Sequence, residues 1–324
     1  MSLDLNNIKY LQNRRSFSLR RISALKKHLK KVKINDPNLC IFAAGSYGRL
    51  TASKHSDLDL FFVHSGKNIS NIKKIEIDSN LIKFCKKNNL PEFSDDGDYL
   101  KIHYLNQIKK ILGSPEDDYK NSFTVRMLML LESYPVYNQV AYMRIIKDFI
   151  RTYFRDYKRH PNDFHTMFLD NDIIRFWKTF CLNYEHRRNT KHDAMKAQIR
   201  NLKLKFSRIF TCFSMVVAIM GLRKMGKISE KNLMKLILKT PIQRLEWLES
   251  NFKDLEKKQY IKFVIKNYCW FLRNTDTNGK ELIKWISQPV NKKEAEFRAE
   301  KFGDNYFDII EHVGGRNTLR YLVI

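Results

Sequence analysis

Cysteine is scarce in this 324-residue chain, and its five cysteines are scattered and never spaced as Cys-x-x-Cys. This scarcity argues against a disulfide framework and a structural zinc site, and it favours a reducing, cytoplasmic location. Long apolar runs are also missing, because none is longer than the six residues of Met215–Met220, whereas a membrane span needs about 20 residues. The first twenty residues are polar and charged, unlike a signal peptide. We therefore expect no membrane partner and a buried helix at 215–220.

Acidic residues are few, since 34 Asp and Glu stand against 60 Lys and Arg, which gives a formal net charge of +26. Residues 5–35 contain no acid at all. In that stretch Ile22, Leu25 and Leu29 recur at helical spacing, which predicts an amphipathic helix with a cationic outer face. A charge excess of this size attracts polyanions such as nucleic acid, nucleotides or an acidic membrane surface.

The most informative segment is Gly-Ser-Tyr-Gly-Arg at 45–49, which Asp57 and Asp59 follow. Apolar residues precede the glycines and follow the two acids, so the pattern predicts two strands around a tight turn. Side chains two residues apart on a strand point to the same face, which brings the two carboxylates together. Paired carboxylates suit a divalent metal for phosphate chemistry. The glycines allow the backbone to approach a triphosphate and offer it N–H groups.

This combination resembles the nucleotidyltransferase superfamily that includes polymerase β, and it is most similar to the branch that contains the PII-uridylyltransferases. The resemblance implies transfer of a nucleoside monophosphate from an NTP to an acceptor hydroxyl, with release of pyrophosphate and two Mg²⁺ ions as cofactors. By the same resemblance, Asp57 and Asp59 are catalytic and hold the metal. The resemblance also implies that Gly45 and Ser46 bind the β- and γ-phosphates of the nucleotide. Arg49 and Lys54, between the turn and the acids, are candidates to balance the charge of the triphosphate.

A third carboxylate is expected on the third strand of that superfamily. The stretch 99–104 alternates like a strand, but it contains no acid. The nearest candidates are Asp96 and Asp98, which we assign as a third metal ligand or base. The alternative is that residues 94–97 form only a polar turn.

The fold class expected from these patterns is α+β, with a small mixed-sheet nucleotidyltransferase core followed by a mostly α-helical domain. We place the catalytic domain with its basic N-terminal helix at 1–113, the helical domain at 114–290, and a tail of unclear structure at 291–324. Within the helical domain we interpret Tyr134-Pro135 as a break between helices. A helix at 70–88 is expected to bury a face that consists of Ile72, Ile75, Ile82 and Cys85.

A cationic stripe on a predicted helix is the candidate nucleic-acid surface. Its members are spaced three or four residues apart and are Arg144, Lys147, Arg151 and Arg155. One interpretation is a surface that contacts RNA phosphates. The other is a solvated helix face, which is the usual fate of charges at this spacing.

The acceptor stays open at this stage. The positive charge favours RNA, such as the end of a tRNA, whereas the resemblance to PII-uridylyltransferases favours a protein side chain. A catalytically silent RNA-binding protein on the same fold is the alternative function. No feature of the sequence predicts which NTP is used or the oligomeric state.

Overall fold

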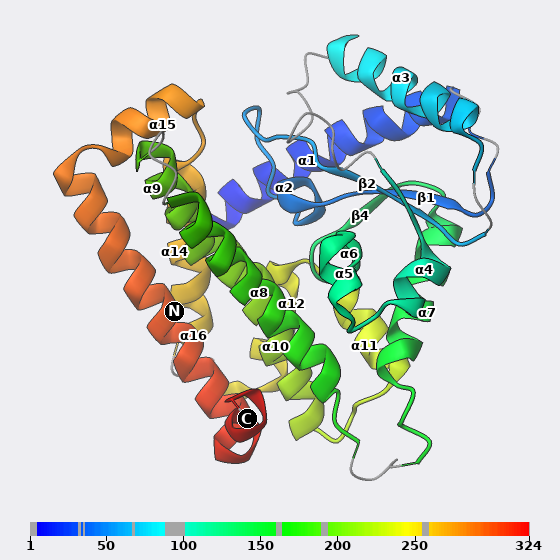
Figure 1. Cartoon of the computed structure of the whole chain (residues 1–324). Coiled ribbons are helices and arrows are strands. Elements are labelled where there is room, and N and C mark those ends of the chain that lie inside the picture. The colour runs from blue at the N-terminus through cyan, green and yellow to red at the C-terminus, as the bar shows by residue number, and fades with distance from the viewer. Residues whose placement is uncertain are drawn as a thin grey trace. The chain divides into compact units, whose positions relative to one another are not determined.

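A computed structural model describes residues 5–31, 34, 36–66, 69–87, 101–159, 164–188, 194–254 and 259–323 (Figure 1). Two compact units are present. One is Leu11–Thr152, and the other combines Met1–Tyr10 with Tyr153–Ile324. We call them the sheet unit and the helical unit.

The sheet unit contains four strands in the order β3-β2-β1-β4. β1 pairs antiparallel with β2 and with β4, whereas β2 and β3 are parallel, so the sheet is mixed as expected. The elements are α1 (Leu5–Lys31), β1 (Leu39–Ala43), α2 (Gly45–Gly48), β2 (Leu60–His64), α3 (Asn71–Lys87), β3 (Ile102–Tyr104), α4 (Leu105–Lys110), α5 (Pro115–Tyr119), α6 (Ser122–Leu131), β4 (Tyr134–Tyr137) and α7 (Gln139–Tyr153).

Helices cover both faces of this sheet. Leu60 and Phe62 of β2 belong to a buried cluster with residues of α1 and α3. Phe61, between them, points to the other face and stacks on Phe42 of β1 with ring centroids 5.5 Å apart. Figure 1 shows α4, α6 and α7 on that second side of the sheet. Because both faces are covered, the central strands are apolar throughout rather than alternating in polarity.

The buried face of α3 differs from the one expected from the sequence. Ile77, Leu81 and Cys85 are buried in the core cluster. The prediction was wrong for Ile72 and Ile75, which are 81% and 67% exposed, and also for Ile82. The pattern was ambiguous because isoleucines lie on both sides of the helix, and periodicity cannot tell which of two apolar stripes meets the sheet.

The segment at Tyr134–Tyr137 is a strand and not a break between helices. It pairs with β1, so that Ala43 lies opposite Tyr134 and Phe42 opposite Pro135. The proline is tolerated because β4 is the edge strand of the sheet. Residues 114–152 therefore belong to the sheet unit, which ends along the chain at Thr152 rather than near residue 113.

The helical unit is built around α10 (Ile209–Lys224), which packs against α8, α12 and α16. Twelve of its residues are buried, including the expected stretch 215–220. The other elements are α8 (Met167–Arg188), α9 (Ala194–Lys203), the π-helix η2 (Leu204–Arg208), α11 (Glu230–Ile237), α12 (Pro241–Asn251), α14 (Tyr260–Asn274), α15 (Gly279–Ile286) and α16 (Pro289–Val323).

One continuous helical stretch, Lys196–Lys224, is long and apolar enough to cross a membrane by length and composition. In this structure 72% of its most apolar window is buried inside the protein. That burial is typical of a helix in a protein core, which can be as long and as apolar as a membrane-spanning helix.

The C-terminal region is mostly helical, although its sequence pattern was hard to interpret. α16 contains a backbone break at Gly315, where φ is +64° and ψ is 174°. Gly315 thus forms a kink within a helical segment.

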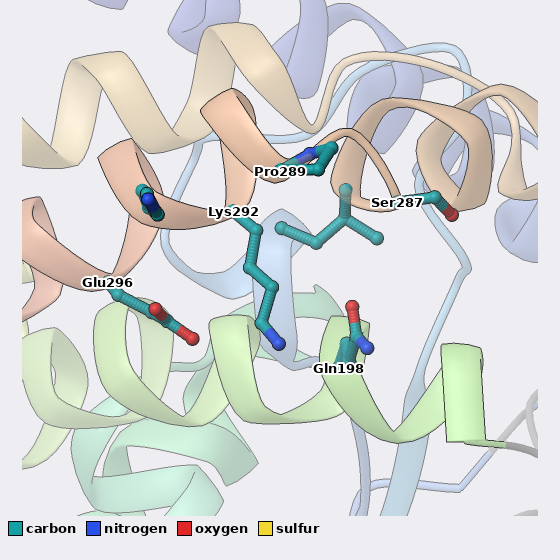
Figure 2. Close-up of a pocket in the computed structure, with 7 residues that line it drawn as sticks. Gln198, Ser287, Pro289, Lys292 and Glu296 are labelled. Atoms are coloured by element: carbon teal, nitrogen blue, oxygen red, sulfur yellow. The ribbon is translucent and has the colours of Figure 1, made fainter.

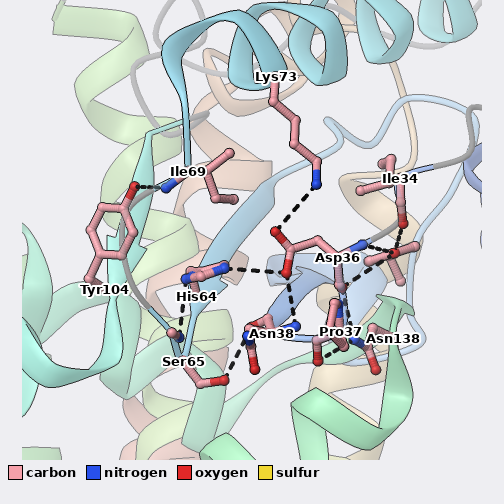
Figure 3. A network of polar contacts seen from close by, with 12 residues as sticks. Ile34, Asp36, Pro37, Asn38, His64, Ser65, Ile69, Lys73, Tyr104 and Asn138 are labelled. Carbon is pink, nitrogen blue, oxygen red and sulfur yellow. Dashed lines mark hydrogen bonds and ion pairs between the residues drawn. The ribbon is translucent and has the colours of Figure 1, made fainter.

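The end of the sheet at Leu39 and His64 is held by a polar network (Figure 3). Asp36 accepts the N–H of Asn38 at 2.9 Å and lies 3.3 Å from His64 Nε2 and 3.6 Å from Lys73 Nζ. Burial alone would raise the pKa of Asp36, but the hydrogen bond from Asn38 and the charges of His64 and Lys73 lower it. This network lies at the end of β1 and β2 away from the glycine turn, so we assign it a structural role.

Candidate active site

The glycine turn between β1 and β2 is a single helical turn, α2. Gly45 has φ +62°, a conformation that costs glycine little and strains other residues. Tyr47 is 2% exposed and packs into the core below the turn, whereas Ser46 is partly exposed. The first N–H groups of a helix have no partner within it. The turn thus presents backbone donors and the Ser46 side chain while Tyr47 anchors it.

Asp59 lies directly against this turn. Its backbone oxygen accepts the N–H of Ala44 at 2.9 Å, which extends the β1–β2 pairing one step beyond the strands. A Cβ built on Gly45 would come within 2.9 Å of Asp59 Oδ2. A side chain at this position would require the carboxylate to shift, so the signature glycine and the second acid of the motif are neighbours in space.

Asp57 and Asp59 precede β2, which begins at Leu60 rather than at residue 57. The alternation expected of a strand is nevertheless kept. Leu58 and Leu60 are buried, whereas Asp57 is exposed and Asp59 is partly exposed. Both carboxylates can therefore be reached from solvent beside the turn.

The spacer between the turn and the acids is fixed to α1. Arg14 Nε donates to the carbonyl of Thr51 at 2.9 Å, and Ala52 N–H donates to Ser18 Oγ at 3.0 Å. Lys54, at the outer end of the spacer, is exposed. Its proposed contact with a triphosphate stays a prediction.

Arg49 occupies a different place from the one expected of a residue that contacts a nucleotide. Its side chain is 8% exposed and forms an ion pair with Glu132, whose side chain is fully buried. Glu132 follows α6 and lies outside the sequence motif. The pair joins the end of α2 to the junction between α6 and β4, which indicates a structural role for Arg49.

A cation on α1 also lies near the turn. Arg21, Tyr47 and Leu58 line one small cavity. Burial raises the pKa of the Tyr47 hydroxyl, and the charge of Arg21 opposes that rise while the charge of Asp57 adds to it. The sequence predicts a cationic outer face for this helix, but helical periodicity does not reveal which of its cations lies next to the turn.

The third carboxylate cannot be placed, because Asp96 and Asp98 fall outside the described residues. On β3 itself, His103 lies opposite Val63 and is 7% exposed. Burial, together with the charge of Lys101, lowers the pKa of His103 to about 4, so the ring is neutral near pH 7. Among the described residues no group of three His, Cys, Asp or Glu side chains is placed to hold a metal ion.

The predicted cationic stripe is only partly continuous. Arg144, Lys147 and Arg151 are exposed on α7, but that helix ends at Tyr153, and Arg155 belongs to the helical unit. Arg144 Nη2 hydrogen-bonds to Ser65 Oγ at 2.9 Å, so this side chain is tied to a loop.

A pocket lies in the helical unit, among α9, α15 and α16 (Figure 2). Its volume is about 500 Å³. Figure 2 shows Lys292 and Glu296 of α16 and Gln198 of α9 around it. No sequence signal pointed to this groove, because its lining comes from residues far apart in the chain.

Residues 25–119 match the family model of the nucleotidyltransferase domain. The match spans the C-terminal end of α1, the glycine turn, both motif acids, β3 and α5. The matched domain is consistent with a polymerase β-like nucleotidyltransferase, and its presence in the chain supports a transferase.

A search of the curated proteins finds no match to the chain. The finer resemblance to PII-uridylyltransferases therefore stays a prediction.

Proposed function

We propose that the protein is a metal-dependent nucleotidyltransferase that moves NMP from an NTP to an acceptor hydroxyl, with RNA as the acceptor. The observation that carries the proposal is the position of Asp59 Oδ2, 2.9 Å from the point where a Cβ on Gly45 would lie. It places a carboxylate beside a turn whose backbone donors suit phosphate oxygens.

The acids present fit Mg²⁺. This ion is commonly held by one or two carboxylates together with water and substrate phosphates, and Asp57 and Asp59 offer two carboxylates open to solvent. The space that a side chain at Gly45 would fill is taken by Asp59 Oδ2, as expected where phosphate, metal and acid must approach closely. When bound, the two Mg²⁺ ions lower the pKa of the attacking hydroxyl and neutralise charge on the leaving pyrophosphate.

The residues of the chain supply binding and orientation in this proposal. The N–H groups of the turn and the Ser46 hydroxyl bind the β- and γ-phosphates. Tyr47 and the bonds from α1 to the spacer keep the turn fixed, so that little ordering is needed when NTP binds. Asp96 and Asp98 remain the candidates for a third carboxylate.

RNA is favoured as acceptor by the exposed face of α1. Arg15, Arg20 and Lys27 are exposed in the part of this helix that belongs to the sheet unit, and no acid interrupts them. Lys147 and Arg151 add exposed cations on α7. Cations arranged in this way bind phosphates without regard to base sequence, so they support a polynucleotide acceptor more than a protein.

The experiment is label transfer from each of four α-³²P NTPs, with Mg²⁺, to total cellular RNA or to lysate protein. Label in RNA supports the proposal. Label in a protein band instead would retain the nucleotidyltransferase activity and replace the acceptor.

The second candidate is a catalytically silent RNA-binding protein. It is favoured by the burial of Arg49, which leaves the motif without the charge expected at that position. The observation that supports it would be salt-sensitive RNA binding that neither NTP nor replacement of Asp57 alters.

A further inference from the structure

Gly48, the last residue of α2, lies against the backbone of Glu132. A Cβ built on Gly48 would lie 2.0 Å from the carbonyl oxygen of Glu132 and 3.0 Å from that of Ala43. No side chain larger than hydrogen fits there. The second glycine of the motif therefore allows α2 to rest on the segment that joins α6 to β4.

The next residue, Arg49, adds a buried ion pair to the same junction. Its Nη1 donates to Glu132 Oε2, and the two side chains are 8% and 0% exposed. A buried charge that loses its partner strongly destabilises the fold. Movement of α2 away from Glu132 would separate the two charges, so the ion pair favours the observed position of α2. Backbone packing and charge pairing thus fix α2 to Glu132 at two successive residues.

Glu132 is itself held firmly. Its N–H donates to the carbonyl of Leu128 at 3.0 Å, which is the last turn of α6. Ser133 lies 2.7 Å from Tyr142 of α7, hydroxyl to hydroxyl, and β4 then pairs with β1 up to Ala43. The same β1 strand leads into the glycine turn, so the turn is supported at its start by β1 and at its end by Glu132.

We infer that Glu132 is a positioning residue for nucleotide binding, and that it sets the distance between the turn and Asp59 through Arg49 and Gly48. Glu132 lies outside residues 25–119, so the functional unit extends beyond the matched domain to β4. The inference rests on the proposed function, since it assigns to the turn the phosphates of an NTP.

The test is Glu132→Gln, which keeps the size of the side chain and removes its charge. We expect KM for NTP and the Kd of a non-hydrolysable NTP with Mg²⁺ to rise at least tenfold, with kcat reduced less. The phosphates bind the turn in the ground state as well as in the transition state. Displacement of the turn therefore weakens the binding of substrate and of transition state equally, which raises KM more than it lowers kcat. Arg49→Lys, which keeps the charge but loses the planar fork, should give a smaller change in the same direction.

A matched control exists in the same unit. Asp117 and Arg126 form a fully buried pair between α5 and α6, with bonds of 2.9 and 2.8 Å. Asp117→Asn removes one charge from a buried pair, as Glu132→Gln does, and should lower the melting temperature without a change in nucleotide affinity. If Glu132→Gln and Asp117→Asn alter Tm alike and neither changes KM or Kd, the pair is only structural and the inference is wrong.

Hydrogen exchange separates this inference from the proposed function. In Glu132→Gln the amides of residues 45–51 should exchange faster than in the wild type, and in Asp117→Asn they should not. This readout needs no turnover. A wild-type protein that neither binds nor uses NTP would overturn the proposed function. Unchanged exchange at 45–51 would overturn the positioning role even in an active enzyme.

Discussion

Gly45 shows most clearly how one residue couples conformation to chemistry. Its positive φ is needed for the turn, and its missing side chain leaves the space that Asp59 Oδ2 occupies. These are separate demands, because the first concerns the backbone and the second the carboxylate. They can be told apart by comparison with a glycine that meets only the first.

Gly45→Ala should reduce NTP turnover by on the order of 10- to 100-fold, because the new methyl group displaces the carboxylate. Backbone strain should also cost about 1–3 kcal/mol of folding free energy. Steady-state kinetics and thermal unfolding measure the two effects. Gly226 has φ +64° with no atom within 4 Å of a built Cβ, so Gly226→Ala should show the strain alone. Equal turnover in the two variants would contradict the role assigned to Gly45.

His103 makes stability depend on pH. Burial, with the charge of Lys101, lowers its pKa from 6.5 to about 4, so the unfolded chain binds a proton more readily than the folded chain. The contribution of the neutral ring to the free energy of unfolding is therefore complete above pH 6.5. It is lost as the pH falls toward 4, at about 1.4 kcal/mol per pH unit. Urea unfolding of wild type and His103→Gln at pH 7, 6 and 5 measures the slope, which should be shallower in the variant by about this amount. Equal slopes of the free energy of unfolding against pH in the two proteins would contradict a neutral, buried His103 ring.

At the scale of elements, the sequence predicted the strands and helices around the motif well. α3 begins and ends within one residue of the helix expected at 70–88, and the apolar run before the glycine turn forms β1, as expected. β4 was missed because its proline made four residues look like a helix break. Its strand character comes from pairing with β1, which no local pattern reports.

The sequence suggests the glycines and acids of the candidate site by their order along the chain, but it does not suggest the residues that support the turn. Gly45 and Asp59 stand in a recognisable order along the chain. Glu132 lies 83 residues from Arg49, and a single glutamate after an apolar helix gives no signal of its partner. Because the sequence does not reveal Glu132 as the partner of Arg49, it suggested the triphosphate as the partner instead.

The exposed face of α1 should dominate RNA binding. Arg20, Lys27 and Lys31 lie on one side of the helix, and each is exposed. Replacing all three by Gln should weaken RNA binding and reduce the slope of log K against log salt by about 0.7–0.9 for each phosphate that the helix no longer neutralises. Filter binding between 50 and 300 mM salt gives the slope.

The control for α1 removes exposed cations from another helix. Lys231 and Lys235 of α11 carry charge in the helical unit, and their replacement by Gln should leave the slope nearly unchanged. The groove residues Lys292 and Lys293 can be exchanged in the same way. A larger change in slope at α11 or at the groove than at α1 would contradict the assignment of RNA to α1.

At the scale of the whole molecule, the proposed function belongs to the sheet unit, whereas both units are rich in Lys and Arg. The matched domain, the turn and both motif acids fall within Leu11–Thr152, apart from the question of a third carboxylate. The helical unit supplies a buried core around α10 and a groove of its own. The positive charge of the chain therefore predicted a polyanion partner, whereas only the glycine turn with its two acids indicated nucleotidyl transfer.

The decisive measurement is label transfer by wild type and by Asp57→Asn/Asp59→Asn in the same reactions. The double variant keeps the size of both side chains, and Asp57 is exposed, so its melting temperature should stay close to that of the wild type. We expect α-³²P from one NTP to enter RNA with the wild type and no label above background with the variant. Wild-type turnover by the double variant would contradict carboxylate-dependent nucleotidyl transfer at this turn.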